Sequence, residues 1–222
     1  MKITYIAVRE IEPAGYTKTG TDISAAASDD SFNSVTTDLS GLLNNQWALV
    51  SGFVNTSNNG WFQANGNSTS TKITQDTTTS LITEAAGAII SIVGYKRGFG
   101  QSYDLEFYSE KAERLVKLDR NVHKPIGGGA AEVLFMHQDV LVDVSAIGAN
   151  GEGITEAQIP QYREFLASVS AGEIFTFDRY GTIAVPVDPR SAQLENGDYS
   201  EELIVGGSDK RYKISFSVRL VN

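Results

Sequence analysis

The sequence contains no cysteine and only two histidines among its 222 residues. Disulfide bonds, zinc–thiolate sites and thiol catalysis are therefore excluded. No apolar run approaches the roughly 18 residues that a membrane-spanning helix needs, and the first residues lack the apolar core of an export signal. We therefore expect a soluble protein with no membrane partner.

Positive charge is also scarce. The 18 Lys and Arg residues stand against 27 Asp and Glu residues, which gives a formal net charge of −9. An acidic surface repels nucleic acid and anionic membranes. A negative surface is of use near DNA only if the task is to let DNA pass without binding it.

Residues that could catalyse a reaction or bind a metal do not cluster. His123 and His137 have neither cysteine nor a carboxylate at ligand spacing. Asp139 and Asp143 share one face of an expected strand, which is more typical of a solvated face than of an acid–base pair. The three glycines 127–129 are not followed by the Lys-Ser/Thr pair of a phosphate loop. We expect no enzyme, and no catalytic, cofactor-binding or metal-binding residues.

A helix is predicted at residues 160–171. Pro160 suits the first helical position, where no backbone N–H is needed, and Gly172 suits the left-handed position just past the end. A start at Thr155, with Gln158 completing a capping box, is an alternative that leaves Pro160 inside the helix. The amphipathic stripe that needs a covering partner consists of Ile159, Tyr162, Phe165, Leu166 and Val169.

Beyond this helix the pattern changes to the two-residue alternation of strands. Strands are predicted at residues 173–178, 182–187 and 201–205, with a polar connection at 188–199. Residues 211–221 show the cleanest alternation of the chain, so this last strand has a firmly determined register. A helix followed by strands needs a sheet to lie on.

The first part of the chain predicts a strand at residues 2–11 that pairs with another at 101–108, which makes the region between them an insertion. Residues 16–33 hold almost no large apolar side chain, so we expect a mobile loop, or an arm that orders on a neighbouring subunit. Residues 109–119 fit a short helix and an edge strand equally well. Two further strands are predicted at residues 132–137 and 140–146.

Residues 35–98 are predicted to form a small β module, because short strands alternate with Asn- and Gly-rich turns. Trp47, Phe53, Trp61 and Phe62 are interpreted as its core. The alternative is an exposed aromatic platform for sugars on Trp47 or Trp61. The strands are expected at residues 46–54, 61–64, 71–75, 81–83 and 89–95.

The same module carries a series of short motifs. Asp38 leads in, and then come W-A-L-V-S-G-F from Trp47, N-N-G-W-F from Asn58, T-K-I-T from Thr71 and E-A-A-G from Glu84. This order resembles a short β module that recurs in virion proteins of tailed phages.

The C-terminal half has a comparable order: residues 128–137 enter a strand, 160–171 form a helix, 173–178 a strand, 186–189 a turn and 213–219 a closing strand. This order resembles the tail-tube-type domain of siphophages, and in particular their distal tail proteins. The resemblance implies a β-sandwich with one flanking helix, assembled as a homohexameric ring around the DNA channel.

Together these patterns predict a mainly β protein. Residues 1–34 and 99–222 would form the tail-tube-like β-sandwich ring domain with one flanking α-helix, and residues 35–98 the small inserted β-barrel-like module. The distal tail family places its accessory domain after the ring domain, whereas this chain carries it earlier.

The expected function is that of a structural virion protein in a long non-contractile tail, made in the host cytoplasm. Its ring at the tail tip or baseplate would join the tail tube protein to the tail hub or fibre proteins, and genomic DNA would pass through the lumen without specific binding. The alternatives are a major tail tube subunit, which stacks into open tubes, and a carbohydrate-binding module for host recognition.

Overall fold

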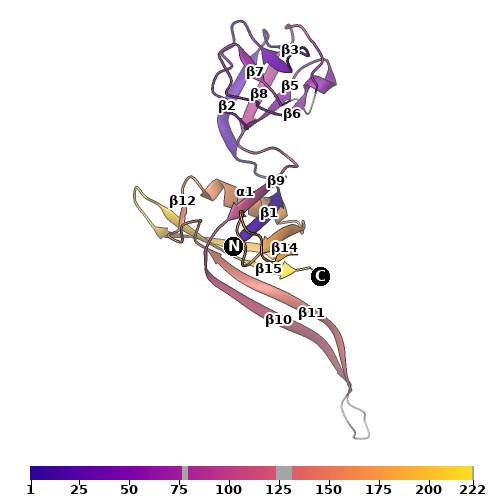
Figure 1. Cartoon of the computed structure of the whole chain (residues 1–222), viewed down its shortest axis with the longest axis vertical. Helices are drawn as coiled ribbons and strands as arrows, with labels where there is room; N and C mark the ends of the chain where they lie inside the picture. The colour runs from indigo at the N-terminus through magenta and orange to yellow at the C-terminus, as the bar shows by residue number, and fades with distance from the viewer. Residues whose placement is uncertain (77–79, 124–131, 222) are drawn as a thin grey trace. The chain divides into compact units, whose positions relative to one another are not determined.

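The computed structural model describes the backbone of residues 1–76, 80–123 and 132–221. Side chains are described for these residues except 117–123 and 132–139. Within this part the chain is mainly β, as predicted (Figure 1).

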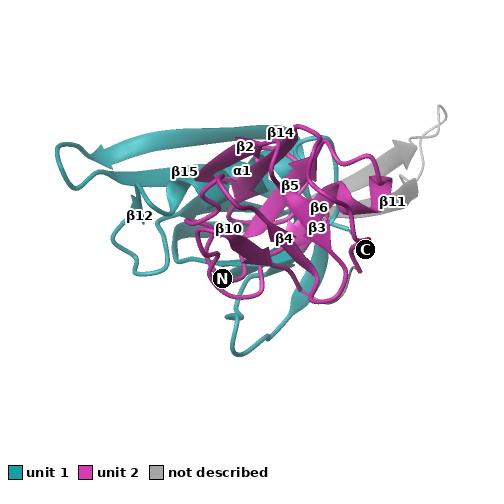
Figure 2. Ribbon diagram, turned by 90° about the horizontal axis from the view of Figure 1, so that it is seen from above, with its two compact units in different colours: residues 1–6, 102–222 teal, residues 7–101 magenta. Residues whose placement is uncertain are grey.

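The described residues contain one α-helix, α1 (Ile159–Val169), and one 3-10 turn, η1 (Thr56–Asn58). The chain forms two compact units, which Figure 2 shows in different colours. Unit 1 consists of Met1–Ile6 and Ser102–Asn222, and unit 2 of Ala7–Gln101.

Unit 1 is built on one antiparallel sheet. Its strands are β1 (Lys2–Ile6), β9 (Ser102–Glu106), β10 (Ser109–His123), β11 (Glu132–Ala146), β12 (Ile154–Thr155), β13 (Phe175–Asp178), β14 (Pro189–Val205) and β15 (Arg211–Leu220). The order is β10-β11-β15-β14-β13-β1-β9, with β12 on β15. The two outermost strands, β9 and β10, are separated in sequence only by Phe107 and Tyr108, so the sheet curls into a half-barrel.

Helix α1 confirms the predicted amphipathic stripe, all of which is buried. Pro160 lies in the first turn, where its missing N–H costs nothing, and Gly172 has a φ of +91° just past the end. The alternative start at Thr155 is wrong, because Thr155 belongs to β12 and its backbone N–H donates to the side chain of Gln158 at 3.1 Å.

The core of unit 1 lies under α1, which packs on β1 and β14. The Phe165 ring is 5.4 Å from Tyr5, 5.2 Å from Phe175 and 5.8 Å from Phe216, between ring centroids. The Tyr5 hydroxyl donates to the buried carboxylate of Glu164 at 2.8 Å. Helix and sheet are therefore joined by aromatic packing and by a satisfied polar contact.

Several predicted strands of unit 1 have different bounds. Residues 109–119 belong to the edge strand β10, not to a helix, and the two strands expected at 132–137 and 140–146 form the single strand β11. The polar residues 188–199 lie largely within β14, because pairing with β15 supplies backbone partners whatever the side chains. Residues 182–187 form no strand.

The chain enters and leaves unit 2 between two paired strands, as predicted, with Ile6 of β1 opposite Ser102 of β9. The compact unit begins at Ala7, however, and not at residue 35. The expectation of a loop or arm at 16–33 is wrong, since this segment pairs with later strands and its few apolar residues are buried. It contains most of β2 (Pro13–Gly20), with β3 (Ser24–Ala26) and β4 (Ser31–Asn33).

Unit 2 holds two small antiparallel sheets, β2-β8-β5-β6 and β3-β4-β7. The remaining strands are β5 (Trp47–Ser51), β6 (Gly60–Gln63), β7 (Lys72–Thr74) and β8 (Ile90–Tyr95). The strand expected at residues 81–83 is absent, and nearby only Glu84 forms an isolated bridge with Ala25. The core includes Tyr16, Ile23, Phe32, Leu39, Leu42, Phe53, Phe62, Ile73, Ile90 and Ile92.

Asp22 holds together the turn that follows β4. Its carboxylate accepts hydrogen bonds from the backbone N–H groups of Val35, Thr36 and Thr37 and from the hydroxyls of Ser34, Thr36 and Thr37. The hydroxyls of Ser34 and Thr37, followed by the backbone donors, hold the pKa of this carboxyl well below its usual range.

Unit 2 is expected to lose stability as the pH falls below about 4, because Asp22 has a lower pKa in the folded state than its unfolded value of about 3.9. Its contribution is complete above that value and is lost as the carboxylate is protonated. Both tryptophans lie in unit 2, so urea unfolding followed by tryptophan fluorescence at about pH 7 and about pH 3 measures this loss. Asp22→Asn should reduce the difference in unfolding free energy between about pH 7 and about pH 3. An unchanged difference would contradict the role assigned to Asp22.

Candidate functional site

A buried carboxylate organises the loop between β13 and β14. Asp178, the last residue of β13, is 2% exposed. Its oxygens accept backbone N–H groups from Tyr180 at 3.1 Å, Gly181 at 2.7 Å, Val187 at 2.7 Å and Asp188 at 3.2 Å. Burial by itself raises the pKa of Asp178, but the four backbone donors outweigh it, so that the pKa lies below the usual value.

The loop that Asp178 anchors displays apolar side chains to solvent. We call residues 180–187 the apolar loop. Hydrogen bonds from its backbone hold this loop in one conformation. The Thr182 N–H donates to the Val185 carbonyl at 2.9 Å, and the Ile183 N–H donates to the Glu106 carboxylate at 2.7 Å. The side chains that are 50% to 65% exposed are Tyr180, Ile183, Val185 and Val187.

Arginines surround a cavity of about 270 Å³ beside the apolar loop. Arg190 pairs with Asp188 at 2.7 Å, and Arg179 donates to the Ala112 carbonyl of β10 and lies 5.4 Å from the Tyr180 ring centroid. Arg114 lines the same cavity from β10. The surface around the apolar loop therefore combines exposed apolar side chains with three arginines and with the carboxylates of Glu106, Asp178 and Asp188.

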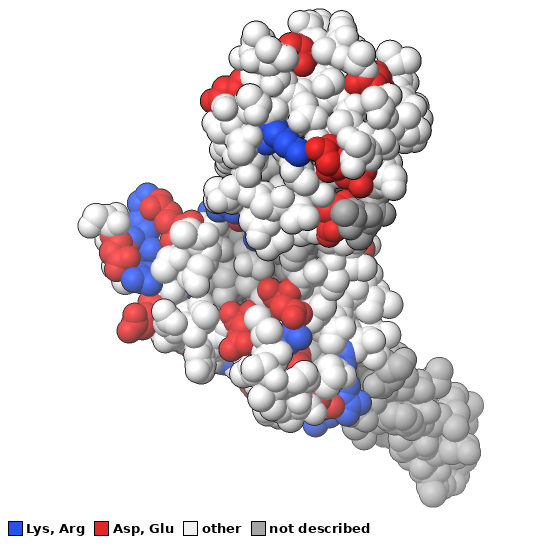
Figure 3. All heavy atoms as spheres, turned by 45° about the horizontal axis from the view of Figure 1, so that its top comes forward, with Lys and Arg blue, Asp and Glu red and all other residues white. Residues whose placement is uncertain are grey.

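A second exposed apolar cluster lies at the far end of β14. Leu203, Ile204 and Val205 end this strand, and each is more than a third exposed. Glu202 beside them pairs with Lys213 at 2.8 Å, but its side chain remains 60% exposed. We call residues 199–205 the hairpin end, and Figure 3 shows acidic and basic side chains close together in this region.

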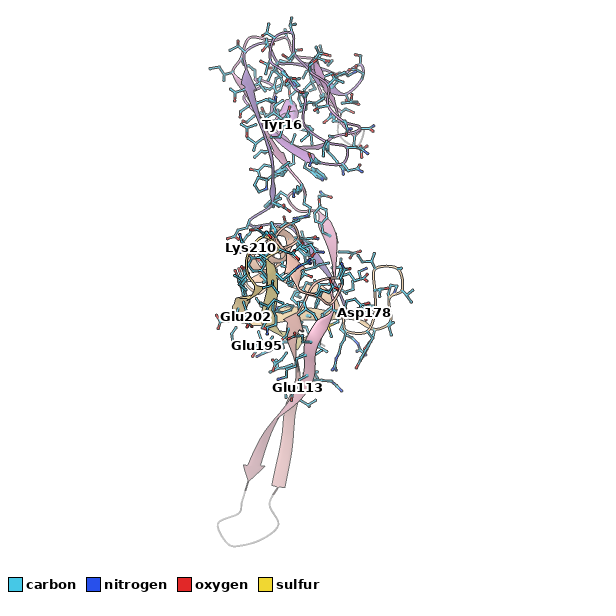
Figure 4. All side chains as sticks on the ribbon, turned by 90° about the vertical axis from the view of Figure 1, so that its left-hand side faces the viewer. Tyr16, Glu113, Asp178, Glu195, Glu202 and Lys210 are labelled. Carbon is cyan, nitrogen blue, oxygen red and sulfur yellow. The ribbon has the colours of Figure 1, made fainter. Side chains whose placement is uncertain are left out.

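The apolar loop and the hairpin end lie at opposite ends of one strand. β14 begins at Pro189, directly after the loop, and ends at Val205. Its register with β15 places these two ends roughly 40 Å apart. Figure 4 labels Asp178, which anchors the apolar loop, and Glu202 of the hairpin end. Within one copy of the chain the two surfaces cannot touch.

The β10–β11 hairpin extends beyond the rest of the sheet. β15 pairs with β11 only from Val140 to Ala146, whereas β10 pairs with β11 as far as Glu132. Residues 132–139 of β11 therefore pair with β10 alone, as a two-stranded ribbon. Such ribbons are marginally stable in water unless another surface packs on them.

The tryptophans of unit 2 do not lie in its core, so that prediction is wrong for Trp47 and Trp61, although Phe53 and Phe62 are buried. Strand alternation explains the difference: Ala48 and Val50 of β5 point to the core, which places Trp47 on the outer face. The core volume is filled instead by residues from the segment that was expected to be a loop.

The outer face of this sheet is aromatic. Trp47 pairs with Gln63 of β6 on one side and with Tyr95 of β8 on the other. The Trp61 ring centroid is 4.8 Å from that of Tyr95 and 6.3 Å from that of Phe99, which lies within 20° of parallel to it. We call this surface the aromatic face.

A cavity of about 420 Å³ opens on the aromatic face. Gly98 lies so close to the Trp47 indole that a Cβ at this position would come within 2.4 Å of the ring. Glycine therefore lets the chain pass directly over Trp47. The cavity is lined by Trp47, Trp61, Phe62, Gln63, Gln75, Asp76, Phe99 and Gln101.

The candidates for chemistry fall largely outside the described part of the chain. The glycines 127–129 lie outside the described residues, as do the side chains of His123, His137 and Asp139. Asp143 accepts a hydrogen bond from the Ser217 hydroxyl at 2.6 Å. Among the described side chains, no group of three His, Asp or Glu residues could hold a metal ion.

The described part of the chain contains no helix long and apolar enough to cross a membrane. The apolar loop, the hairpin end and the aromatic face were not singled out by sequence motifs, and only Trp47 and Trp61 had been considered as an exposed surface. In comparisons with known proteins, no family model matches this chain, and no curated protein or solved structure is significantly similar to it.

Proposed function

We propose that this chain is a structural virion protein of a long non-contractile phage tail. It forms a ring at the distal end of the tail tube and joins the tube to the tail hub and the host-recognition apparatus. The observation that carries the proposal is the pair of exposed apolar surfaces at opposite ends of β14.

A contact between these two ends explains why both are exposed. The hairpin end of one copy packs on the apolar loop of the next, so that both apolar clusters leave solvent. Such a head-to-tail contact uses two different surfaces, so that it forms a closed ring when the rotation between copies closes. Large exposed apolar surfaces otherwise favour aggregation.

In this proposal, unit 1 is a tail-tube-like β-sandwich. Its curled sheet provides the layers, and α1 is the flanking helix, packed on β1 and β14. Unit 2 is the inserted barrel-like accessory module, carried between β1 and β9. The net charge of −9 suits a lumen through which genomic DNA slides without adhering.

The projecting β10–β11 ribbon provides the contact along the tail axis. A ribbon that needs another chain to pack on can join the ring to the tail tube protein on one side or to the hub on the other. The same ribbon favours one rival function. In a major tail tube subunit it would join identical rings into long open tubes.

The mass of the purified protein by light scattering, with negative-stain images of the same sample, tests the proposal. We expect closed particles of six or twelve chains of 24.0 kDa with a central hole. Long tubes would instead favour the rival function of a major tail tube subunit. A monomer that stays monomeric at high concentration would overturn both functions.

A further inference from the structure

We infer that the aromatic face of unit 2 binds a neutral oligosaccharide, with a pyranose ring stacked on Trp61 and Phe99 in the cavity beside Trp47. This goes beyond the ring function, because it rests on unit 2 alone. The starting point is the position of the aromatic side chains. The buried core cluster of unit 2 does not include the tryptophans, which are half-buried on the outer face.

The rings form a surface suited to stacking. Phe99 is 51% exposed, and its ring lies nearly parallel to that of Trp61 at 6.3 Å between centroids. One face of a pyranose consists of C–H groups, which pack favourably on aromatic rings. The rings are also held in place, because Tyr95 packs on Trp61 and residue 98 is a glycine that fits against Trp47. A pre-organised platform loses little entropy on binding.

The polar lining of the cavity supplies what sugar hydroxyls need. Gln63, Gln75 and Gln101 carry amides, which both donate and accept hydrogen bonds, and Asp76 carries a carboxylate that accepts them. The backbone fixes this side of the cavity, since the Asp76 N–H donates to the Gln63 carbonyl at 2.8 Å. Asp76 is the one charged residue of the lining, which favours a neutral glycan over an anionic one.

The size of the cavity agrees with this ligand class. Its volume of about 420 Å³ falls within the roughly 300–1,000 Å³ of small-molecule sites. Four polar residues line this one hollow beside the aromatic rings, although the Gln63 amide also donates to the Asn45 carbonyl at 3.3 Å. The combination of stacked aromatic rings, amides and a carboxylate is what identifies a sugar.

The test is a titration of the full chain with a panel of neutral hexasaccharides built from glucose, galactose, mannose or N-acetylglucosamine. Tryptophan fluorescence is the readout, and calorimetry confirms binding. At least one sugar is expected to change the fluorescence saturably, with a dissociation constant between about 1 μM and 1 mM. Phe99→Ala, which leaves both fluorophores in place, should weaken that binding by about tenfold or more.

Val54→Ala is the matched control, because Val54 is an exposed apolar residue of unit 2 outside the cavity. It should bind like the unaltered chain. No response to any sugar of the panel would overturn the inference, and so would a response that Phe99→Ala leaves unchanged. Either result would leave the ring proposal intact, because light scattering tests that proposal separately.

Discussion

Replacing Ile183 and Val185 together with aspartate is expected to leave monomers in place of the proposed ring. Both side chains are at least 50% exposed in the single chain, so that the substitution removes no core contact. In the assembled ring each would bury an apolar side chain worth about 1.5–3 kcal/mol, and a buried carboxylate adds a further cost. The contact should therefore weaken by about 100-fold or more. Light scattering at one concentration measures the effect.

A matched pair of controls separates assembly from folding. Val54→Asp with Ile82→Asp places the same charges on exposed apolar positions of unit 2 and should leave the particle mass unchanged. The melting temperature of the loop variant should also stay close to that of the unaltered chain. A loop variant that still forms closed particles would contradict the proposed contact.

Mixing two variants tests the head-to-tail arrangement itself. Leu203→Asp with Val205→Asp disables the hairpin end and should also give monomers. Each variant keeps the surface that the other has lost, so that an equimolar mixture should form dimers and stop there. A contact between two identical surfaces predicts instead that the variant which keeps that surface associates with itself, without the other variant. Analytical ultracentrifugation distinguishes the two outcomes.

Asp178→Ala is expected to destabilise unit 1 by about 3 kcal/mol or more and to prevent ring formation. It leaves the backbone N–H groups of four loop residues without their acceptor. That of Gly181 is buried, where an unsatisfied donor costs about 1–3 kcal/mol, and the other three are partly buried. Without this anchor the apolar loop also loses its pre-organised conformation, which weakens association further. Urea unfolding followed by circular dichroism measures the loss of stability.

Tryptophan fluorescence supplies an internal control for this variant. Unit 1 contains no tryptophan, so that fluorescence reports on unit 2, and the Asp178→Ala transition seen by fluorescence should stay in place. Because the folded pKa of Asp178 is lowered, its contribution is present above the unfolded value of about 3.9 and is lost as the pH falls. The variant should therefore show a smaller loss of unit 1 stability in acid, and an equal loss would contradict this role.

Local patterns predicted the elements whose partners lie close in sequence or whose periodicity is strong. The stripe from Ile159 to Val169 predicted a buried helix face, and the alternation at residues 211–221 predicted β15 almost to its ends. The pairing of β1 with β9 followed from two similar strands on either side of a compositionally different segment. Each of these signals depends on the residues of the element itself.

Other elements owe their structure to partners that are distant in the chain. Residues 16–33 looked too polar to order, yet β2 forms because β8 supplies its hydrogen bonds. Residues 182–187 alternate like a strand, but Asp178 accepts the backbone N–H groups at both ends of the loop. The amino-acid composition of a short segment does not show which distant residues will accept the hydrogen bonds of its backbone.

By itself, the sequence determined that this protein is mainly β, that one helix has a buried stripe and that the acidic chain has no cysteine chemistry. The tertiary structure alone decided which apolar side chains stay in solvent, namely those of the apolar loop and the hairpin end of unit 1, and it left the tryptophans of unit 2 half-buried outside the core. The reason is that an apolar residue is buried only where another element covers it, and which face is covered depends on strand register and on contacts between segments far apart in sequence.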